Sequence, residues 1–269
     1  MIRNSRKAKN VFIFLMIFLF QNLVYAANPK KDVFDYGLSF FSHSVNQDER
    51  TSLELTPDRP LKFTSNSFEI SFDLKLKEEL YTYGYVARII ANDVASFDIV
   101  SYLLKGKLNF VLTNKDKIIE NISIEDSLKI IKDKWTTIRL QFNKNEIRVK
   151  VGETEFKMNH SFNDFQNIKI YFGRNKHPNF YTTDVPPMTI RNILIKKNNG
   201  EVFRKWELMG HNRNEVFDVV NNDRATVENG IWEIDKHTKW TRIKSFTTAN
   251  KNPQVTFDDT SGRIFVAYD

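Results

Sequence analysis

The chain has 269 residues, of which 13% are aromatic and none is cysteine, so one large β domain or two smaller domains must be held together by the hydrophobic core alone. The lack of cysteine excludes disulfides, thiolate metal sites, cysteine nucleophiles and lipid attachment through cysteine. The formal net charge is +7, but four of the positive charges lie within the first nine residues, and no acidic residue occurs before Asp32.

The first 26 residues have the pattern of a secretory signal peptide. Basic residues precede an apolar run from Val11 to Phe20, and Val24 and Ala26 supply the small residues of a cleavage site. The run is about half of the roughly 20 residues that a membrane-spanning helix needs, so we expect cleavage and no stable membrane insertion afterwards. Export would place the protein in the periplasm, on the cell surface or outside the cell. Removal of residues 1–26 leaves a net charge near +3, which argues against a nucleic-acid partner.

Alternating apolar residues predict several strands in the first half of the chain. We expect an edge strand within residues 32–46, a short strand within 50–57, and a clear strand over 68–76 with one apolar and one polar face. Residues 83–91 and 97–104 are more continuously apolar, as is typical of central strands buried on both faces. Residues 107–113 are expected to pair with the strand before them.

The clearest hairpin runs from Trp135 to Val151 and is predicted to lie in the middle of a large antiparallel sandwich. Its apolar face consists of Ile138, Leu140, Phe142, Ile147, Val149 and Val151, and its outward face of Arg139, Gln141, Arg148 and Lys150. The outward face could line a groove for an acidic glycan. Alternatively it is merely solvated, with Glu69 and Asp73 nearby to balance its charge.

The remaining elements are expected to be mostly short. A helix could form within residues 124–134, and strands are expected at 153–158, 168–172, 189–196, 203–208 and 231–234, with a polar excursion over 210–230. After Asp235 the pattern changes to a strand at 240–246 and a hairpin of 255–257 with 263–268. Together these segments predict an all-β fold, a two-sheet antiparallel jelly-roll sandwich with a short C-terminal β-hairpin extension.

The motifs also carry a family resemblance. The pattern W-T-T-I-R-L…I-R-V-K-V-G resembles the central hairpin of laminin-G-like, concanavalin A-like lectin domains. Four further motifs resemble the N-terminal domain of a group of exported Bacteroidetes proteins: DERTSLELTP (48–57), YTYGYVARI (81–89), NKHPNFYTTDVPPMTIRNI (175–193) and WELMGHNRNEVFDVV (206–220).

In that group a kelch-type, galactose-oxidase-like β-propeller follows the lectin-like domain. NGIWEIDKHTKW (229–240) resembles the junction, and NPQVTFDDTSGRIFVAYD (252–269) resembles the opening strands of the first blade. The resemblance covers residues 33–269. It implies a signal peptide at 1–26, a concanavalin A-like β-sandwich at 27–235 and an incomplete first blade at 236–269.

The sequence offers little for catalysis. A β-glucanase of this fold would carry three alternating carboxylates on one strand, whereas only Glu69 and Asp73 alternate here. The five histidines are scattered singly, no G-x-S-x-G motif occurs, and galactose-oxidase chemistry would require a cysteine-modified tyrosine. We therefore expect a protein that is not an enzyme.

The loop 174–187 concentrates side chains that suit sugars, and we expect ligand-binding residues there: Asn175, His177, Asn179, Tyr181 and Asp184. An aromatic ring can stack on a sugar while amides and carboxylates bind its hydroxyls. Asp184 could instead help to hold Ca²⁺ as a cofactor. The alternative is a structural return loop, with Phe180 and Tyr181 packed on the sandwich.

These observations predict an exported, non-catalytic carbohydrate-binding or interaction module whose partner is an extracellular glycan. Two alternatives stay open. The domain could support a β-propeller without a ligand of its own, or it could be the ancillary domain of a carbohydrate-active enzyme.

Overall fold

A computed structural model describes residues 36–63, 67–77, 83–102, 107–114, 117–123, 133–160, 165–209, 214–234, 254–258 and 263–267. In these ranges every regular element is a strand, and no helix that could cross a membrane is found among them. The expected signal peptide, the strand at 240–246 and nearly all of the expected helix at 124–134 lie outside the described residues.

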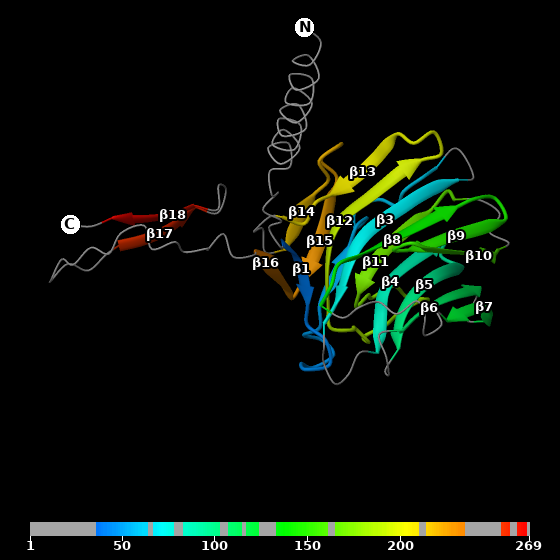
Figure 1. Ribbon diagram of the computed structural model, residues 1–269, viewed down its shortest axis with the longest axis horizontal. Helices are drawn as coiled ribbons and strands as arrows, with labels where there is room; N and C mark the ends of the chain where they lie inside the picture. The colour runs from blue at the N-terminus through cyan, green and yellow to red at the C-terminus, as the bar shows by residue number, and fades with distance from the viewer. Residues whose placement is uncertain are drawn as a thin grey trace, which may run out of the picture. The chain divides into compact units, whose positions relative to one another are not determined.

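The strands form two eight-stranded antiparallel sheets (Figure 1). Sheet A runs in the order β10 (Thr154–Asn159), β9 (Glu146–Val151), β8 (Thr136–Phe142), β3 (Phe68–Leu76), β12 (Met188–Lys197), β1 (Tyr36–Phe40) and β16 (Gly230–Ile234), and β13 (Val202–Trp206) also pairs with β12. Sheet B runs in the order β14 (Glu215–Phe217), β15 (Arg224–Glu228), β2 (Ser52–Glu54), β11 (Ile168–Gly173), β4 (Gly84–Ala91), β5 (Ala95–Tyr102), β6 (Lys107–Asn114) and β7 (Lys117–Ser123). The predicted two-sheet jelly-roll sandwich is confirmed.

The core lies between the two sheets and is held together by phenylalanines. Phe72 of sheet A meets Phe172 of sheet B edge-on, with ring centroids 5.0 Å apart. Phe142 of sheet A meets Phe97 of sheet B in the same way at 5.7 Å. Each fully buried aromatic side chain contributes about 2–3 kcal/mol from burial, so a sandwich without disulfides can rest on this core.

The predicted hairpin is formed by β8 and β9, and all six residues of its apolar face are buried. On the outward face, Arg139 pairs with Glu69 at 3.6 Å and Arg148 pairs with Glu146 at 2.6 Å. This ion pairing favours the interpretation as a solvated, balanced face. The hairpin does not lie in the middle of its sheet, because β10 alone separates it from the edge.

Two expectations about the ends of the domain are wrong. β1 is not an edge strand, because β16 returns from far along the chain and pairs with it, with Leu38 opposite Trp232. The polar excursion 210–230 contains β14 and β15, which extend sheet B beside β2. These strands are short, and only Ala225 and Val227 of β15 are buried, so their alternation is too brief to stand out.

The predicted C-terminal hairpin is also present. β17 (Gln254–Asp258) and β18 (Arg263–Ala267) pair antiparallel as a separate two-stranded sheet.

Candidate functional site

The face of sheet B turned away from the core carries a hollow of about 350 Å³. Along β5 the inward residues Phe97 and Ile99 join the core, so Asp98 and Val100 face outward. The hollow is lined by Tyr83, Tyr85, Arg88, Asp98, Val100, Tyr102, Asn109, Val111, Thr113, Ile118, Asn179, Phe180 and Tyr181. It therefore draws on strands β4 to β7 and on the loop 174–187.

Strand register places the floor of this hollow. Arg88 of β4 lies opposite Asp98 of β5, and Asp98 lies opposite Val111 of β6. Tyr85 of β4 likewise lies opposite Val100 of β5, and Val100 lies opposite Asn109 of β6, which gives a second row of residues facing outward. A register shift between Tyr85 and Ala87 sets these rows, so the floor depends on a bulge that local alternation does not show.

The centre of the floor is a buried ion pair. Arg88 Nε and Nη2 donate to the two carboxylate oxygens of Asp98, each at 2.7 Å. Burial lowers the pKa of the Arg88 guanidinium, but the hydrogen bonds and charge of Asp98 outweigh it and the net shift is upward. A bidentate pair in this setting fixes the position of both side chains.

Aromatic rings form the walls of the hollow. The Tyr85 ring lies against the Arg88 guanidinium, whose carbon is 4.2 Å from the ring centroid. Tyr83 and Tyr102 meet edge-on, with centroids 6.3 Å apart. Tyr102 and Tyr181 are 51% and 63% exposed, so two rings at the rim offer surface to a ligand.

The same arginine ties the loop 174–187 to the sheet. Arg88 Nη1 donates to the carbonyl oxygen of Phe180 at 2.5 Å. The Phe180 ring is buried with Ile90 and Tyr171 in a small apolar cluster, separate from the main core, on this side of sheet B. The loop is thus positioned by both polar and apolar contacts, and Tyr181 follows directly at the rim.

Asp93 is the second anchor of the loop. It lies in the turn between β4 and β5 with a left-handed φ of +57°, which aspartate tolerates better than most residues. Its carboxylate accepts hydrogen bonds from Lys169 Nζ at 2.8 Å and from His177 Nε2 at 2.9 Å, and its carbonyl accepts one from Asn179 Nδ2 at 3.0 Å. The bond from Lys169, followed by the one from His177, lowers the pKa of Asp93.

The five predicted ligand-binding residues divide into three groups. Asn179 and Tyr181 line the hollow. Asn175 and His177 are only 1% and 5% exposed; Asn175 pairs with Thr182 through the backbone, and His177 holds Asp93. Asp184 lies apart from the hollow, with its Oδ1 atom 3.4 Å from both Arg50 Nη1 and His43 Nε2. The contacts of Asn175 and His177 match the interpretation as a structural loop, whereas a ligand role for Asn179 and Tyr181 stays a prediction.

A calcium ion at Asp184 would have to compete with these two partners. Within the described ranges, no group of three or more histidine, aspartate or glutamate side chains is placed to hold a metal ion. A role for Asp184 in calcium binding stays a prediction, and addition of Ca²⁺ in the binding experiment below tests it.

The sequence pattern did not indicate the residues that the strands contribute to the hollow, chiefly Tyr85, Arg88, Asp98, Tyr102 and Asn109. Their segments look continuously apolar, which correctly predicts central strands but hides the outward face. The available signal was a pair of charges, Arg88 and Asp98, inside otherwise apolar runs, because a buried charge needs a partner.

The two carboxylates considered for catalysis lie outside the hollow. Asp73 accepts hydrogen bonds from Thr137 Oγ1 at 2.8 Å and from Asn192 Nδ2 at 2.9 Å. Glu69 pairs with Arg139 and with Lys196 at 3.6 and 3.7 Å. Both carboxylates are engaged with neighbouring strands.

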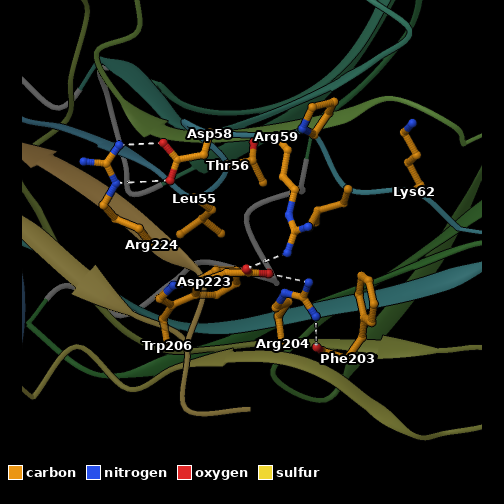
Figure 2. Close-up of a pocket in the computed structure, with 12 residues that line it drawn as sticks. Leu55, Thr56, Asp58, Arg59, Lys62, Phe203, Arg204, Trp206, Asp223 and Arg224 are labelled. Atoms are coloured by element: carbon orange, nitrogen blue, oxygen red, sulfur yellow. Dashed lines mark hydrogen bonds and ion pairs between the residues drawn. The ribbon is translucent and has the colours of Figure 1, made fainter. Parts of the chain in front are cut away.

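A larger cavity, of about 450 Å³, lies between β13, the start of β15 and the loop after β2 (Figure 2). Buried Leu55, Leu61 and Trp206 form its apolar part. The charged residues around them are Asp58, Arg59, Lys62, Arg204, Asp223 and Arg224. Figure 2 shows Arg59 and Arg204 on either side of the Asp223 carboxylate, and Arg224 facing Asp58.

No protein-family model and no curated protein sequence matches this chain. Among solved structures, domains LG4-5 of the mouse laminin α1 chain are similar over 64% of this chain, with 16% identity and a TM-score of 0.44; the match covers 44% of that chain, so this chain spans less than half of its length. The galectin LEC-6 of Caenorhabditis elegans is similar over 51% of this chain and 91% of its own, with 11% identity and a TM-score of 0.36.

The carbohydrate binding module CBM66 from Bacillus subtilis is similar over 61% of this chain and 84% of its own, with 9% identity and a TM-score of 0.37. At these levels the similarities carry no functional argument. The fold assignment rests on the two sheets and their strand order.

Proposed function

We propose that this protein is a carbohydrate-binding module and that its saccharide site is the hollow on the outer face of sheet B. The observation that supports this most is the pairing of exposed tyrosines at the rim with a fixed polar floor in one hollow. Tyr102 and Tyr181 provide the rings, and the Arg88–Asp98 pair provides the floor.

The chemistry of a sugar fits this arrangement. The C–H face of a pyranose packs on an aromatic ring, and its hydroxyls need donors and acceptors at fixed positions. Asn109 of β6 and Asn179 of the loop also line the hollow and bring amide groups to it. The volume of about 350 Å³ lies at the lower end of the range of about 300–1,000 Å³ typical of small-molecule pockets, which suits one or two sugar rings.

The same geometry supports binding without catalysis. Glycoside hydrolysis normally requires two carboxyl groups flanking the scissile bond. Among the described residues that line the hollow, Asp98 is the one carboxylate, and both of its oxygens are bonded to Arg88. A bound saccharide would therefore be held and not cleaved.

The proposal includes export through the predicted signal peptide, with a glycan outside the cell or in the periplasm as the partner. The continuation into a β-propeller stays a prediction from the sequence motifs. A purely structural domain would have no need of two exposed tyrosines around a polar floor, so a binding role is preferred.

A glycan array probed with the full chain, with and without Ca²⁺, tests this function. We expect binding to a defined set of saccharides that Tyr181→Ala and Tyr102→Ala each weaken. Phe217→Ala is the matched control, because Phe217 is an exposed aromatic residue on β14, outside the hollow. Absence of binding under all conditions, or equal loss in all three variants, would refute the proposal; reducing-sugar release would refute its non-catalytic part.

A further inference from the structure

The cavity between β13 and β15 has features of a binding site that the saccharide hollow does not share. Four basic residues and two aspartates line it, and the basic side chains come from three separate segments: Arg59 and Lys62 from the loop after β2, Arg204 from β13, and Arg224 from β15. Because the segments are far apart in sequence, only the fold brings these charges together.

The carboxylates of this cavity already have partners. Arg224 donates to both oxygens of Asp58, through Nη2 at 2.5 Å and Nε at 3.1 Å. Arg59 Nη2 donates to Asp223 Oδ1 at 2.9 Å, and Arg204 Nη2 pairs with Asp223 Oδ2. Each carboxylate oxygen that lines the cavity therefore has a basic partner.

Two more carboxylates pair with the lining arginines without lining the cavity themselves. Glu215 accepts from Arg224 Nη1 at 2.8 Å. Asp218 is 3.8 Å from Arg204 Nε, but its oxygens accept hydrogen bonds from the backbone amides of Lys205, Val220 and Asn221. Neither is a free acceptor that faces the cavity.

Unused donors remain. Lys62 is exposed and stands apart from the paired arginines in Figure 2. Trp206 Nε1 is buried in the cavity wall and has no hydrogen-bond partner in the described part of the chain. The buried hydroxyl oxygen of Thr56, Oγ1, likewise has no partner there. Buried polar groups in proteins are nearly always bonded, so these groups beside a cavity are available to an acceptor from outside the protein.

We propose that this cavity is a binding site for an oxyanion, meaning a carboxylate, sulfate or phosphate group. Such a group is rich in acceptors and negatively charged, which matches the donors left over here. Arg59 would bind the anion directly. Its side chain is 73% exposed, and an exposed ion pair such as Arg59–Asp223 contributes little to stability. The guanidinium can therefore turn from Asp223 to a ligand. Leu55 and Leu61 provide an apolar floor for the group that carries the anion.

The test is an NMR titration of the full chain at constant ionic strength, because added salt alone would screen exposed charges. The probes are sodium glucuronate, sulfate and phosphate, with glucose as the neutral control, up to about 20 mM, well above a dissociation constant of about 1 mM. The reporter is the indole N–H resonance of Trp206, identified by its loss in Trp206→Phe. We expect this resonance to shift with at least one oxyanion and not with glucose.

The variant Arg59→Gln/Lys62→Gln should weaken that binding at least tenfold. Its matched control is Arg139→Gln/Lys150→Gln, which removes one arginine and one lysine from the outward face of the β8–β9 hairpin and should leave binding unchanged.

A response to glucuronate alone would identify an acidic sugar as the source of the anion. A response to sulfate or phosphate would identify an inorganic or esterified group. No shift with any oxyanion, or equal weakening in both double variants, would overturn the proposal. Tyr181→Ala separates it from the saccharide site, since it should leave this titration unchanged.

Discussion

The hollow on sheet B and the cavity between β13 and β15 both contain arginine–aspartate pairs, but at different depths. In the hollow, the Arg88–Asp98 pair is buried under exposed tyrosines. In the cavity, buried Leu55 and Trp206 lie beneath. Arg204 is buried there, but the pairs Arg224–Asp58 and Arg59–Asp223 remain partly exposed. A buried pair fixes geometry and is costly to break, whereas an exposed pair can exchange partners at small cost. The first arrangement suits a rigid site for a neutral, shaped ligand, and the second suits a site that accepts charge.

Breaking the buried pair should have the largest effect. Asp98→Asn or Arg88→Met leaves the other member buried without its partner, and we expect a loss of about 3–5 kcal/mol in the free energy of unfolding. Chemical denaturation of the full chain measures this. The double variant Arg88→Met/Asp98→Leu serves as the control and should recover most of the loss, because it removes both charges. A single variant that costs less than about 1 kcal/mol would show that the floor is not held by this pair.

Replacement of Tyr181 at the rim should lower the affinity for saccharide without lowering the stability of the fold. Tyr181→Ala is expected to weaken saccharide binding about tenfold, or about 1.4 kcal/mol, because the ring is exposed and contributes to the ligand and not to the core. The free energy of unfolding should change by less than about 0.5 kcal/mol. Calorimetric titration and denaturation measure the two quantities. A large loss of stability with unchanged affinity would assign Tyr181 to the structural loop.

The contribution of Asp93, which anchors the loop 174–187, to the free energy of unfolding should depend on pH. Because the pKa of Asp93 is lowered in the folded state, its contribution to stability is present above the ordinary value of 3.8 and is lost as the pH falls through the folded value. Asp93→Asn keeps a residue that tolerates the left-handed φ but removes the charge. We expect it to lower stability by about 1 kcal/mol or less at pH 6 and to have a smaller effect at pH 3. An effect that grows on acidification would contradict this role.

The smallest change in the free energy of unfolding is expected at the exposed Arg224–Asp58 pair. Arg224→Gln removes the bidentate partner that lowers the pKa of Asp58, but solvent screens this site. Denaturation should show a change close to the error of the measurement at moderate salt. A clear loss of stability, comparable to that of Asp98→Asn, would remove the distinction between the two cavities.

The strands that the sequence predicts are those whose alternation is long enough to identify a face. β3 occurs over the expected residues 68–76, and the β8–β9 hairpin buries all six of its predicted apolar residues. β14 and β15 were missed because three- and five-residue strands with few buried residues look like polar loop.

The site was predictable only where polar residues cluster in one segment. The loop 174–187 stands out for that reason, and Asn179 and Tyr181 do line the hollow. Arg88 and Asp98 could not be placed together, because their pairing depends on the register of two strands and on a bulge between Tyr85 and Ala87. Asn175 and His177 are buried: Asn175 bonds to Thr182 within the loop, and His177 bonds to Asp93 in the turn between β4 and β5, a contact that depends on the fold.

The most direct test of the saccharide site is a map of backbone amide shifts in the full chain during titration with the strongest saccharide from the glycan array. The largest shifts should fall on β4, β5 and β6 around Arg88, Asp98 and Asn109, and on residues 179–181. Shifts centred on sheet A or on the cavity between β13 and β15, with none on β4 to β6, would contradict the assignment of the saccharide site to this hollow.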